Sequence, residues 1–311
     1  MGAELVIDAR NAVGESPVWH AGEQALYWVD IGGRWLWRWD AASGAARRWR
    51  TPEMTGCIAA SSRGGWLCAM ESGIFHASPG EGDALPCTRL ANVDHPRPGM
   101  RFNDGRCDRQ GRLRAGTMAL DMAANLAVGS LYAFDGPGVL RPLVRELIVP
   151  NGLAFSPDGR TMYLSDSHPD VQAVWAFDYD TATGTPSRRR LFVDMVPLPG
   201  RPDGAAVDAD GCYWICANDA GLVHRFTPRG ELDRSIALPV KKPSMCAFGG
   251  ANLDTLYVTS IRPAGDIADQ PLAGGLFAIR PGVPGLPEPA CITPLPSSPF
   301  PSRPGHTKET P

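Results

Sequence analysis

The stretch EQALYWVD (residues 23–30) is a polar turn followed by aromatic and β-branched residues, and it decides the fold because similar stretches recur along the chain. Their first strand residues are separated by 40, 47, 49, 51 and 43 residues. Apolar runs of this kind between Gly- and Asp-containing turns are typical of β-strands. The other five stretches are GGWLCAM (64–70), GRLRAGTM (111–118), GRTMYLSD (159–166), GCYWICA (211–217) and DTLYVTS (254–260).

A second alternating run follows each of these strands, so each repeat contains at least one hairpin. These runs are RWLWRWD (34–40), GIFHAS (73–78), SLYAFDG (130–136), AVWAFDYD (173–180), LVHRFTP (222–228) and GLFAIRP (275–281). Six such repeats predict an all-β, six-bladed β-propeller. We expect residues 1–296 to form this single domain, with ELVID (4–8) joining the last blade, and the Pro- and Ser-rich residues 297–311 to form a mobile tail.

The composition excludes several classes of protein. The chain has 311 residues and a net charge of −3, which argues against binding to nucleic acid or to an acidic membrane surface. No apolar stretch approaches the roughly 20 residues that span a bilayer, and the N-terminus lacks the apolar core of a signal peptide. We therefore expect a cytoplasmic protein with no membrane or nucleic-acid partner; the sequence predicts no oligomeric state. Its eight cysteines show no zinc-site spacing and are expected to be buried thiols.

About ten residues before each repeat lies a stretch that we interpret as the innermost strand of the blade, which lines the central channel. In five of the six stretches an oxygen-bearing side chain occupies a matching offset, 10 to 12 residues before the first residue of the next strand. These residues are Glu15, Asn103, Asn151, Asp203 and Ser244. The symmetry of a propeller would bring them together at one end of the channel.

Carboxylates and amides buried around one axis are costly without a partner, and a divalent cation removes that cost. Ligands that are all oxygen favour Ca²⁺, Mg²⁺ or Mn²⁺, although Zn²⁺ and Fe²⁺ also accept them. In the alternative interpretation Asn151 and Asp203, each followed by Gly, are only turn formers. Turn chemistry does not explain the shared offset, so we favour a site with one divalent metal ion.

The motifs GESPVWH (14–20), RFNDGRCD (101–108), GTM (116–118), NGLAFSPDG (151–159), RPDG (201–204) and PLAGGLFAI (271–279) resemble the gluconolactonase/regucalcin (senescence marker protein) family of sugar lactonases over nearly the whole chain. The resemblance implies a propeller with one channel metal held by Glu15, Asn151 and Asp203. It also implies that Arg101 and Asn103 contact the substrate. Asp121 stands where the family commonly has Glu, and its shorter side chain changes the reach toward a sugar hydroxyl.

The resemblance also implies an activity, the metal-dependent opening of an aldono-1,4- or 1,5-lactone to the sugar acid. We expect Asp203 to act as metal ligand and general base and Arg101 to stabilise the oxyanion. Arg101 could instead pair with Asp104, Asn103 could bond a local turn, and Asp121 could be a solvated loop acid; Asp166 is interpreted as a surface turn residue. The alternatives for the protein are an aryl-ester or phosphotriester hydrolase, or a non-enzymatic Ca²⁺-binding regulatory protein.

Overall fold

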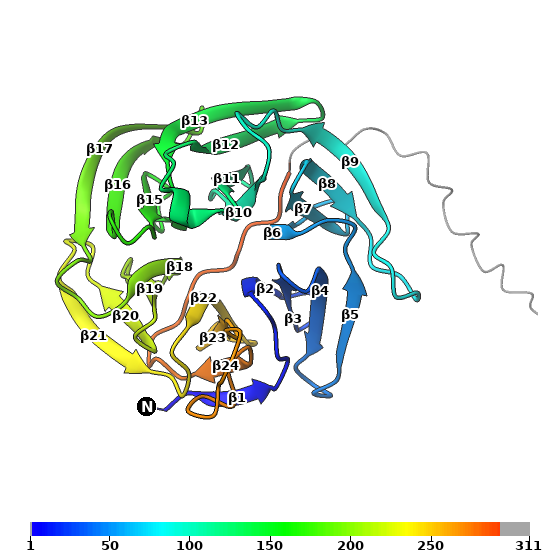
Figure 1. Cartoon of the computed structure of the whole chain (residues 1–311), viewed down its shortest axis with the longest axis vertical. Coiled ribbons are helices and arrows are strands. Elements are labelled where there is room, and N and C mark those ends of the chain that lie inside the picture. Colours follow the sequence, from blue (N-terminus) through cyan, green and yellow to red (C-terminus); the bar gives the residue numbers. More distant parts are fainter. Residues whose placement is uncertain (1, 293–311) are drawn as a thin grey trace, which may run out of the picture.

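Six four-stranded antiparallel sheets form a ring in the computed structural model, which describes residues 2–292 (Figure 1). The predicted six-bladed β-propeller is therefore confirmed. Residue 1 and residues 293–311 are not described, so the predicted domain end at 296 and the predicted tail at 297–311 lie outside the described residues. The helical structure in residues 2–292 is the 3₁₀ turn η1 (Met122–Ala124), and none of it is long and apolar enough to cross a membrane.

Each sheet runs in chain order from the channel outward. The first three sheets are β2 (Gly14–His20), β3 (Ala25–Asp30), β4 (Trp35–Asp40), β5 (Ala46–Arg50); β6 (Thr55–Ala60), β7 (Trp66–Met70), β8 (Gly73–Ala77), β9 (Cys87–Asn92); and β10 (Met100–Cys107), β11 (Leu113–Ala119), β12 (Gly129–Gly136), β13 (Val139–Leu147). The last three are β14 (Pro150–Phe155), β15 (Thr161–Asp166), β16 (Ala173–Asp180), β17 (Thr185–Asp194); β18 (Arg201–Val207), β19 (Tyr213–Asn218), β20 (Leu222–Phe226), β21 (Leu232–Ala237); and β22 (Pro243–Gly249), β23 (Thr255–Ser260), β24 (Leu276–Ile279), β1 (Glu4–Ile7).

The ring is closed by the N-terminal strand, as predicted. Strand β1 pairs antiparallel with β24, with Leu5 opposite Phe277, and supplies the outermost strand of the sixth sheet. The fourth strands of the other five blades were not predicted. These strands lie at the outer edge, where most side chains face solvent; in β5 only Trp49 is buried. A strand with so few buried positions carries little hydrophobic alternation.

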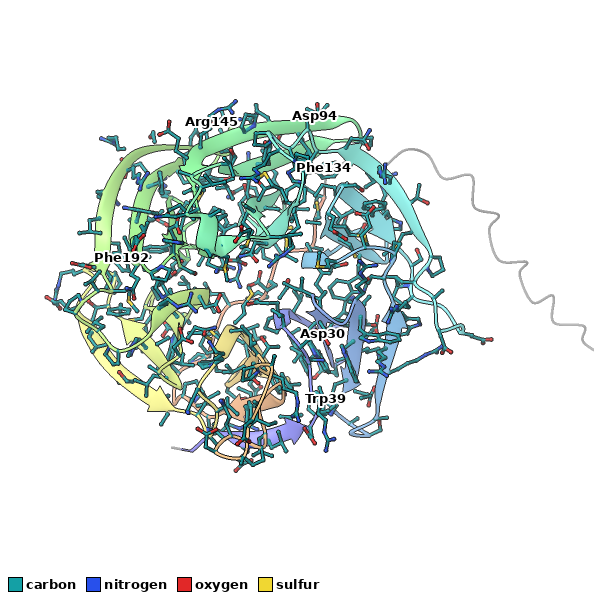
Figure 2. All side chains as sticks on the ribbon, in the orientation of Figure 1. Asp30, Trp39, Asp94, Phe134, Arg145 and Phe192 are labelled. Carbon is teal, nitrogen blue, oxygen red and sulfur yellow. The ribbon has the colours of Figure 1, made fainter. Side chains whose placement is uncertain are left out.

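The apolar core lies between neighbouring sheets. One cluster joins Leu67 and Ile74 of the second blade to Phe102, Leu113 and Phe134 of the third, all buried. Figure 2 shows side chains filling each blade, with Phe134 inside the ring and Arg145 at its outer rim. All eight cysteines lie within residues 2–292 as reduced thiols, and all but Cys87 are buried, as expected for core residues.

An irregularity in pairing occurs near the start of every inner strand. The register shifts lie between Glu15 and Val18, Thr55 and Cys57, Phe102 and Gly105, Asn151 and Ala154, Pro202 and Ala205, and Pro243 and Cys246. The five residues that share an offset in the sequence lie at or within these bulges. Because a bulge bends its strand and re-aims side chains, it positions these residues at one end of the channel.

The opposite end of the channel is crossed by residues 284–292, which we call the C-terminal strap (Figure 1). The strap exchanges backbone hydrogen bonds with loops that follow inner strands: Gly285 N donates to Leu253 O, Ala209 N to Pro284 O, Cys291 N to Ala60 O and Ile292 N to Gly111 O. Glu288 of the strap pairs with Arg106 of β10 at 3.0 Å. The strap and the bulges therefore lie at opposite ends of the inner strands.

Buried carboxylates hold the turns of the blades together. Asp166 is 2% exposed and accepts the backbone N–H groups of Ile148, Val149 and His168. The expectation that Asp166 is a surface turn residue is therefore wrong: three backbone donors compensate the burial of its carboxylate. On the strap side, the fully buried Asp208 accepts hydrogen bonds from Trp214 Nε1 and Arg225 Nε, both at 2.8 Å.

Replacing Asp208 with alanine should lower the free energy of unfolding by about 3–5 kcal/mol, because the buried Trp214 Nε1, the backbone N–H of Cys212 and Arg225 Nε all lose this acceptor. Asp210→Ala is the matched control, since Asp210 also pairs with Arg225, at 3.0 Å, but is 62% exposed; it should cost at most about 1 kcal/mol. Urea unfolding followed by tryptophan fluorescence measures both. An equal loss of unfolding free energy in the two variants would contradict the structural role assigned to buried Asp208.

Candidate functional site

Four of the predicted site residues meet at the channel end that carries the bulges. Glu15, Asn103, Asn151 and Asp203 come from β2, β10, β14 and β18, and each is at most 8% exposed. Asn103 Nδ2 donates to Asn151 Oδ1 at 3.0 Å, and Arg101 Nη1 donates to Asn103 Oδ1 at 2.7 Å. The fold therefore brings together side chains from four blades that are far apart in the sequence.

Glu15 is a buried carboxylate with one oxygen available. Its Oε2 accepts the backbone N–H of Ser16 at 3.1 Å, and Oε1 accepts no hydrogen bond from residues 2–292. Burial raises the pKa of Glu15 well above its usual range, and the nearby charges of Asp203 and Asp104 raise it further. The backbone of Ser16 is in the left-handed region, with φ 51°. Strain of this kind beside a buried acid is frequent at functional sites.

Asp203, like Glu15, is a buried carboxylate with one hydrogen-bonded oxygen and one available oxygen. Asn218, at the end of β19, donates from Nδ2 to Asp203 Oδ2 at 2.6 Å, while Oδ1 has no donor in the described part of the chain. Burial raises the pKa of Asp203 to about 7; the hydrogen bond from Asn218 and the charge of Arg201 lower it only partly. Glu15 and Asp203 are thus two buried carboxyl groups, each with one oxygen without a partner.

Asn151 is oriented by its neighbours. Its Nδ2 donates to Ser167 Oγ at 2.6 Å, and Ser167 in turn donates to the carbonyl oxygen of Pro202. The next residue, Gly152, has φ 60°, and a Cβ there would lie 2.5 Å from Tyr213 Oη and 2.6 Å from Ser165 Oγ. Only glycine fits this position, so the NG pair is required by the bulge that positions the Asn151 amide.

The side chains of Glu15, Asn151 and Asp203 fit a hard divalent cation. Each offers an oxygen at the same end of the channel, and a cation would compensate the two buried carboxylates, which otherwise lack a full set of partners. Within residues 2–292 no three His, Cys, Asp or Glu side chains gather in a metal-binding arrangement. The Asn151 amide oxygen is a third oxygen that could serve as a ligand beside the two carboxylates.

Arg101 lies beside these residues. Burial lowers its pKa to about 10, against the opposing charges of Glu15, Glu71 and Asp203. No ion pair with Asp104 is formed in the described structure; Arg101 Nη1 instead donates to Phe102 O and Asn103 Oδ1, and Nε and Nη2 have no acceptor among residues 2–292. Arg101 thus keeps donors available for a ligand oxygen.

Three predicted residues have other surroundings. Asn103 donates both amide hydrogens within the protein, to Pro150 O and Asn151 Oδ1. Ser244 donates to Gly14 O and contacts Thr259 Oγ1, so it links the first and last blades. Asp121 is exposed at the start of η1, and no contact joins it to the other site residues.

Sequence reasoning missed Asn218, Ser167 and the role of Asp104. Asn218 and Ser167 lie at or just beyond the end of the second strand in their blades, which is the same end of the channel as the bulges. Asp104 is buried, accepts the N–H of Leu153 at 2.8 Å and leaves Oδ1 unpaired. The only sequence signal for all three is their position at a strand end or beside Asn103.

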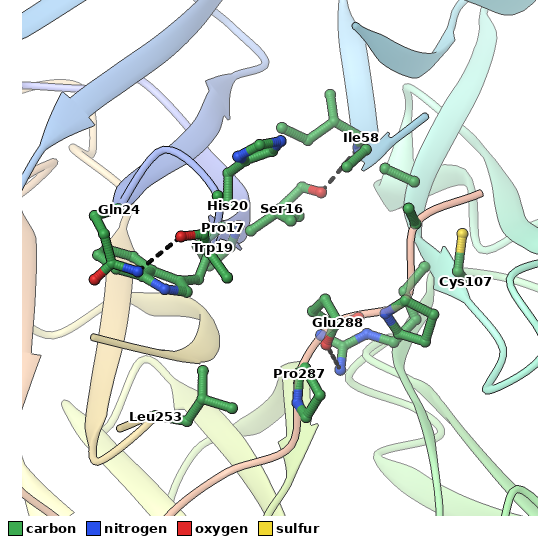
Figure 3. A pocket seen from close by; sticks show the side chains of 18 of the residues that line it. Ser16, Pro17, Trp19, His20, Gln24, Ile58, Cys107, Leu253, Pro287 and Glu288 are labelled. Atoms are coloured by element: carbon green, nitrogen blue, oxygen red, sulfur yellow. Dashed lines mark hydrogen bonds and ion pairs between the residues drawn. The ribbon is translucent and has the colours of Figure 1, made fainter. Parts of the chain in front are cut away.

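Two cavities flank this arrangement. A cavity of about 340 Å³ at the bulge end is lined by Met122, Ala123, Val149, His168, Pro169, Arg201, Asp219 and Lys242. A second cavity, of about 300 Å³, lies at the strap end between β2 and residues 287–290 (Figure 3). The figure shows the Arg106–Glu288 pair and the hydrogen bond from Ile58 N to Ser16 Oγ at its wall. None of the predicted site residues lines either cavity.

Known proteins resemble the chain over nearly its whole length. A 6-deoxy-6-sulfogluconolactonase from Pseudomonas putida is 40% identical over 294 residues, covering 92% of this chain and 97% of the relative. Regucalcin from Gallus gallus is 35% identical over 292 residues, covering 91% and 96%. The crystal structure of a calcium-binding regucalcin from Agrobacterium tumefaciens superposes with a TM-score of 0.86 at 30% identity, covering 94% and 97%.

The predicted resemblance is confirmed at the level of the family. The description that matches is "SMP-30/Gluconolactonase/LRE-like region", and the match spans residues 13–262. These residues run from the start of the first blade into the last one and include every predicted site residue. The chain therefore belongs to the SMP-30/gluconolactonase/LRE-like family.

Proposed function

We propose that the chain is a divalent-metal-dependent hydrolase that opens a sugar lactone, an aldono-1,4- or 1,5-lactone, to the sugar acid. The observation that carries the proposal is the pair of buried carboxylates, Glu15 and Asp203, each with a free oxygen beside the Asn151 amide and the Arg101 guanidinium. Membership of a family with a relative named as a 6-deoxy-6-sulfogluconolactonase, from Pseudomonas putida, supports a sugar lactone as the substrate.

Glu15, Asn151 and Asp203 would hold the metal ion, which we expect to be Ca²⁺, Zn²⁺, Mn²⁺, Mg²⁺ or Fe²⁺. When bound, the ion would polarise the lactone carbonyl or lower the pKa of a water molecule. Asn103 and Ser167 fix the Asn151 amide from both of its ends, since one donates to Oδ1 and the other accepts from Nδ2. This keeps the amide oxygen in position without a substrate.

Asp203 acts as the general base in this proposal. Asn218 holds Oδ2, so Oδ1 is the oxygen that can accept a proton from the attacking water. Arg101 presents Nε and Nη2 to the carbonyl oxygen as it gains negative charge, because its Nη1 is already used by Asn103 and Phe102. Water attack forms the new C–O bond as its proton passes to Asp203; the ring C–O bond then breaks, and the ring oxygen takes that proton from Asp203 and leaves as the sugar hydroxyl.

Asn103 has a positioning role in this proposal, in addition to the substrate contact that the family resemblance implies. Its side chain joins Arg101 to Asn151. Asp121 lies on the loop that contributes Met122 and Ala123 to the cavity of about 340 Å³. We propose that Asp121 binds a sugar hydroxyl from this loop.

A second candidate is a calcium-binding protein without catalysis, which the description of the Agrobacterium relative as calcium-binding favours. Both functions use the same three ligands. They differ in Arg101, because a calcium site alone gains nothing from a buried cation beside it. A third candidate, an enzyme for aryl esters or phosphotriesters, is tested by assaying those compounds beside the sugar lactone.

Asp203→Asn should lower kcat for glucono-1,5-lactone by about 10²–10⁴-fold, as expected for the loss of a general base. The measurement is proton release in a pH-stat after chelation and reloading with each metal ion. Asp210→Asn, at the strap end and 62% exposed, is the control and should retain full activity. Undiminished turnover by Asp203→Asn, or by the chelated wild type, would contradict the proposal. If only aryl esters or phosphotriesters react, the sugar substrate is wrong.

Arg101→Gln should lower kcat by about 10²–10³-fold, the usual effect of removing one oxyanion donor. Arg101→Lys keeps the charge but not the fork of donors and should restore only part of the rate. Arg145→Gln, at the outer rim, is the control. A calcium-binding protein without catalysis predicts no turnover in the wild type and unchanged or tighter Ca²⁺ binding in Arg101→Gln.

Metal binding should be coupled to protons. In the metal-free protein, burial raises the pKa of Asp203 to about 7 and also raises that of Glu15. The folded state then binds more protons than the unfolded chain between about pH 4 and 7, so the stability of the metal-free protein falls as pH rises through this range. The metal requires both carboxylates ionised, so its affinity rises with pH over the same range.

Thermal unfolding at pH 5 to 8, with chelator or with metal, measures this coupling. The difference in Tm between the two conditions should widen toward pH 7, and the widening should be smaller in Asp203→Asn. A difference that is constant across this pH range would show that the buried carboxyls do not bind the ion.

A further inference from the structure

A pair of basic residues borders the site and has no role in the proposed reaction. Arg201 is two residues before Asp203, and Lys242 is two residues before Ser244, so each lies at the start of its inner strand. Arg201 lies opposite Asn218 of β19, the residue that donates to Asp203, directly before the bulge between Pro202 and Ala205. Both cations line the cavity of about 340 Å³ at this end of the propeller.

The two cations share one carboxylate. Arg201 Nε lies 2.7 Å from Asp219 Oδ2, and Lys242 Nζ pairs with Asp219 Oδ1. The side chains are partly open, at 25% exposure for Arg201 and 28% for Lys242. Among the Lys, Arg, Asp and Glu side chains of the cavity lining, Arg201 and Lys242 carry two positive charges and Asp219 one negative charge, a surplus of one positive charge. Asp170, 69% exposed, lies outside the lining and is bonded by Asn125.

Asp219 and Ser167 give this arrangement its geometry. The backbone of Asp219 is in the left-handed region, with φ 77°, which is uncommon for a residue other than glycine. Arg201 Nη1 donates to the carbonyl of Ser167, the residue whose hydroxyl accepts from Asn151. Arg201 Nη2 has no acceptor among residues 2–292. The basic pair is therefore built into the same hydrogen-bond network as the candidate metal ligands and keeps a free donor.

We propose that Arg201 and Lys242 bind an anionic group on the sugar lactone, carried on the exocyclic carbon away from the reacting carbonyl. A sulfonate, a phosphate and a carboxylate all offer the oxygens that a guanidinium and an ammonium recognise. The cavity is large enough for a hexose-sized ligand. The inference rests on the proposed function for the reacting end of the substrate and adds the class of substituent at the other end.

The test compares kcat/KM for glucono-1,5-lactone with that for its 6-phosphate, its 6-sulfonate and the lactone of glucaric acid. The wild type should prefer the anionic lactones by at least about tenfold, and added salt should reduce the preference. The three anionic substrates show which acid group fits best. No preference for any anionic lactone, with glucono-1,5-lactone still hydrolysed, would overturn the inference and leave the proposed function standing.

Two substitutions are expected to change the ratio of anionic to neutral kcat/KM in opposite directions, and they distinguish anion binding from a purely structural network of ion pairs. Lys242→Gln should reduce the ratio of anionic to neutral kcat/KM by about tenfold. Asp219→Asn, which keeps a residue tolerant of positive φ, removes the competing carboxylate and should raise the ratio. A structural network predicts losses of the same sign in both. Lys241→Gln is the matched control, because Lys241 pairs with Asp269 outside the cavity.

If the wild type hydrolyses neither the neutral nor the anionic lactones, the proposed function is wrong, but the anion site can still be tested by measuring ligand binding. Calorimetry on the metal-loaded protein would compare gluconate 6-phosphate with gluconate. Tighter binding of the phosphate, weakened in Lys242→Gln and not in Lys241→Gln, supports the basic pair as an anion site. Equal affinities, or a preference that Lys242→Gln leaves unchanged, would overturn it.

Discussion

The burial of Glu15 and Asp203 at one end of a common channel is the constraint on which the site depends. Two carboxyl groups in such surroundings favour the protonated form, and each has only one of its two oxygens satisfied by a protein donor. Three neighbours moderate the cost: Asn218 bonds Asp203, Ser16 bonds Glu15, and Arg101 supplies positive charge. The remaining deficit is of the kind that a bound cation removes.

The propeller meets this constraint through its inner strands. Each blade contributes one strand to the channel, and the bulge near its start turns a side chain that regular pairing would not present there. Ser16 and Gly152 accept positive φ directly after Glu15 and Asn151. The same bulge thus recurs in blades that carry different side chains at this position. Asn103 donates a hydrogen bond to Asn151, whereas Ser244 links the first and last blades.

The sequence predicted the number of blades, the ring closure by residues 4–8 and the set Glu15, Asn103, Asn151 and Asp203, because all of these depend on spacing that repeats. The outer strands escaped prediction because strands such as β17 expose most of their side chains. Asn218 and Ser167 escaped because their roles depend on which blade lies beside which. Asp166 was misread because an acid at a strand end looks the same whether it faces solvent or binds three backbone amides. The metal and the roles of the site residues stay predictions.

The pairing of β1 with β24 has a consequence for biosynthesis. Residues 4–7 leave the ribosome roughly 10 to 60 seconds before residues 276–279 at ordinary elongation rates. Until then the earliest strand has no partner, and the sixth blade has an open edge next to the first. Asp203 likewise emerges long after Glu15. The nascent chain therefore has to remain soluble as an incomplete arc, and the three proposed ligands can come together only after Asp203 has emerged.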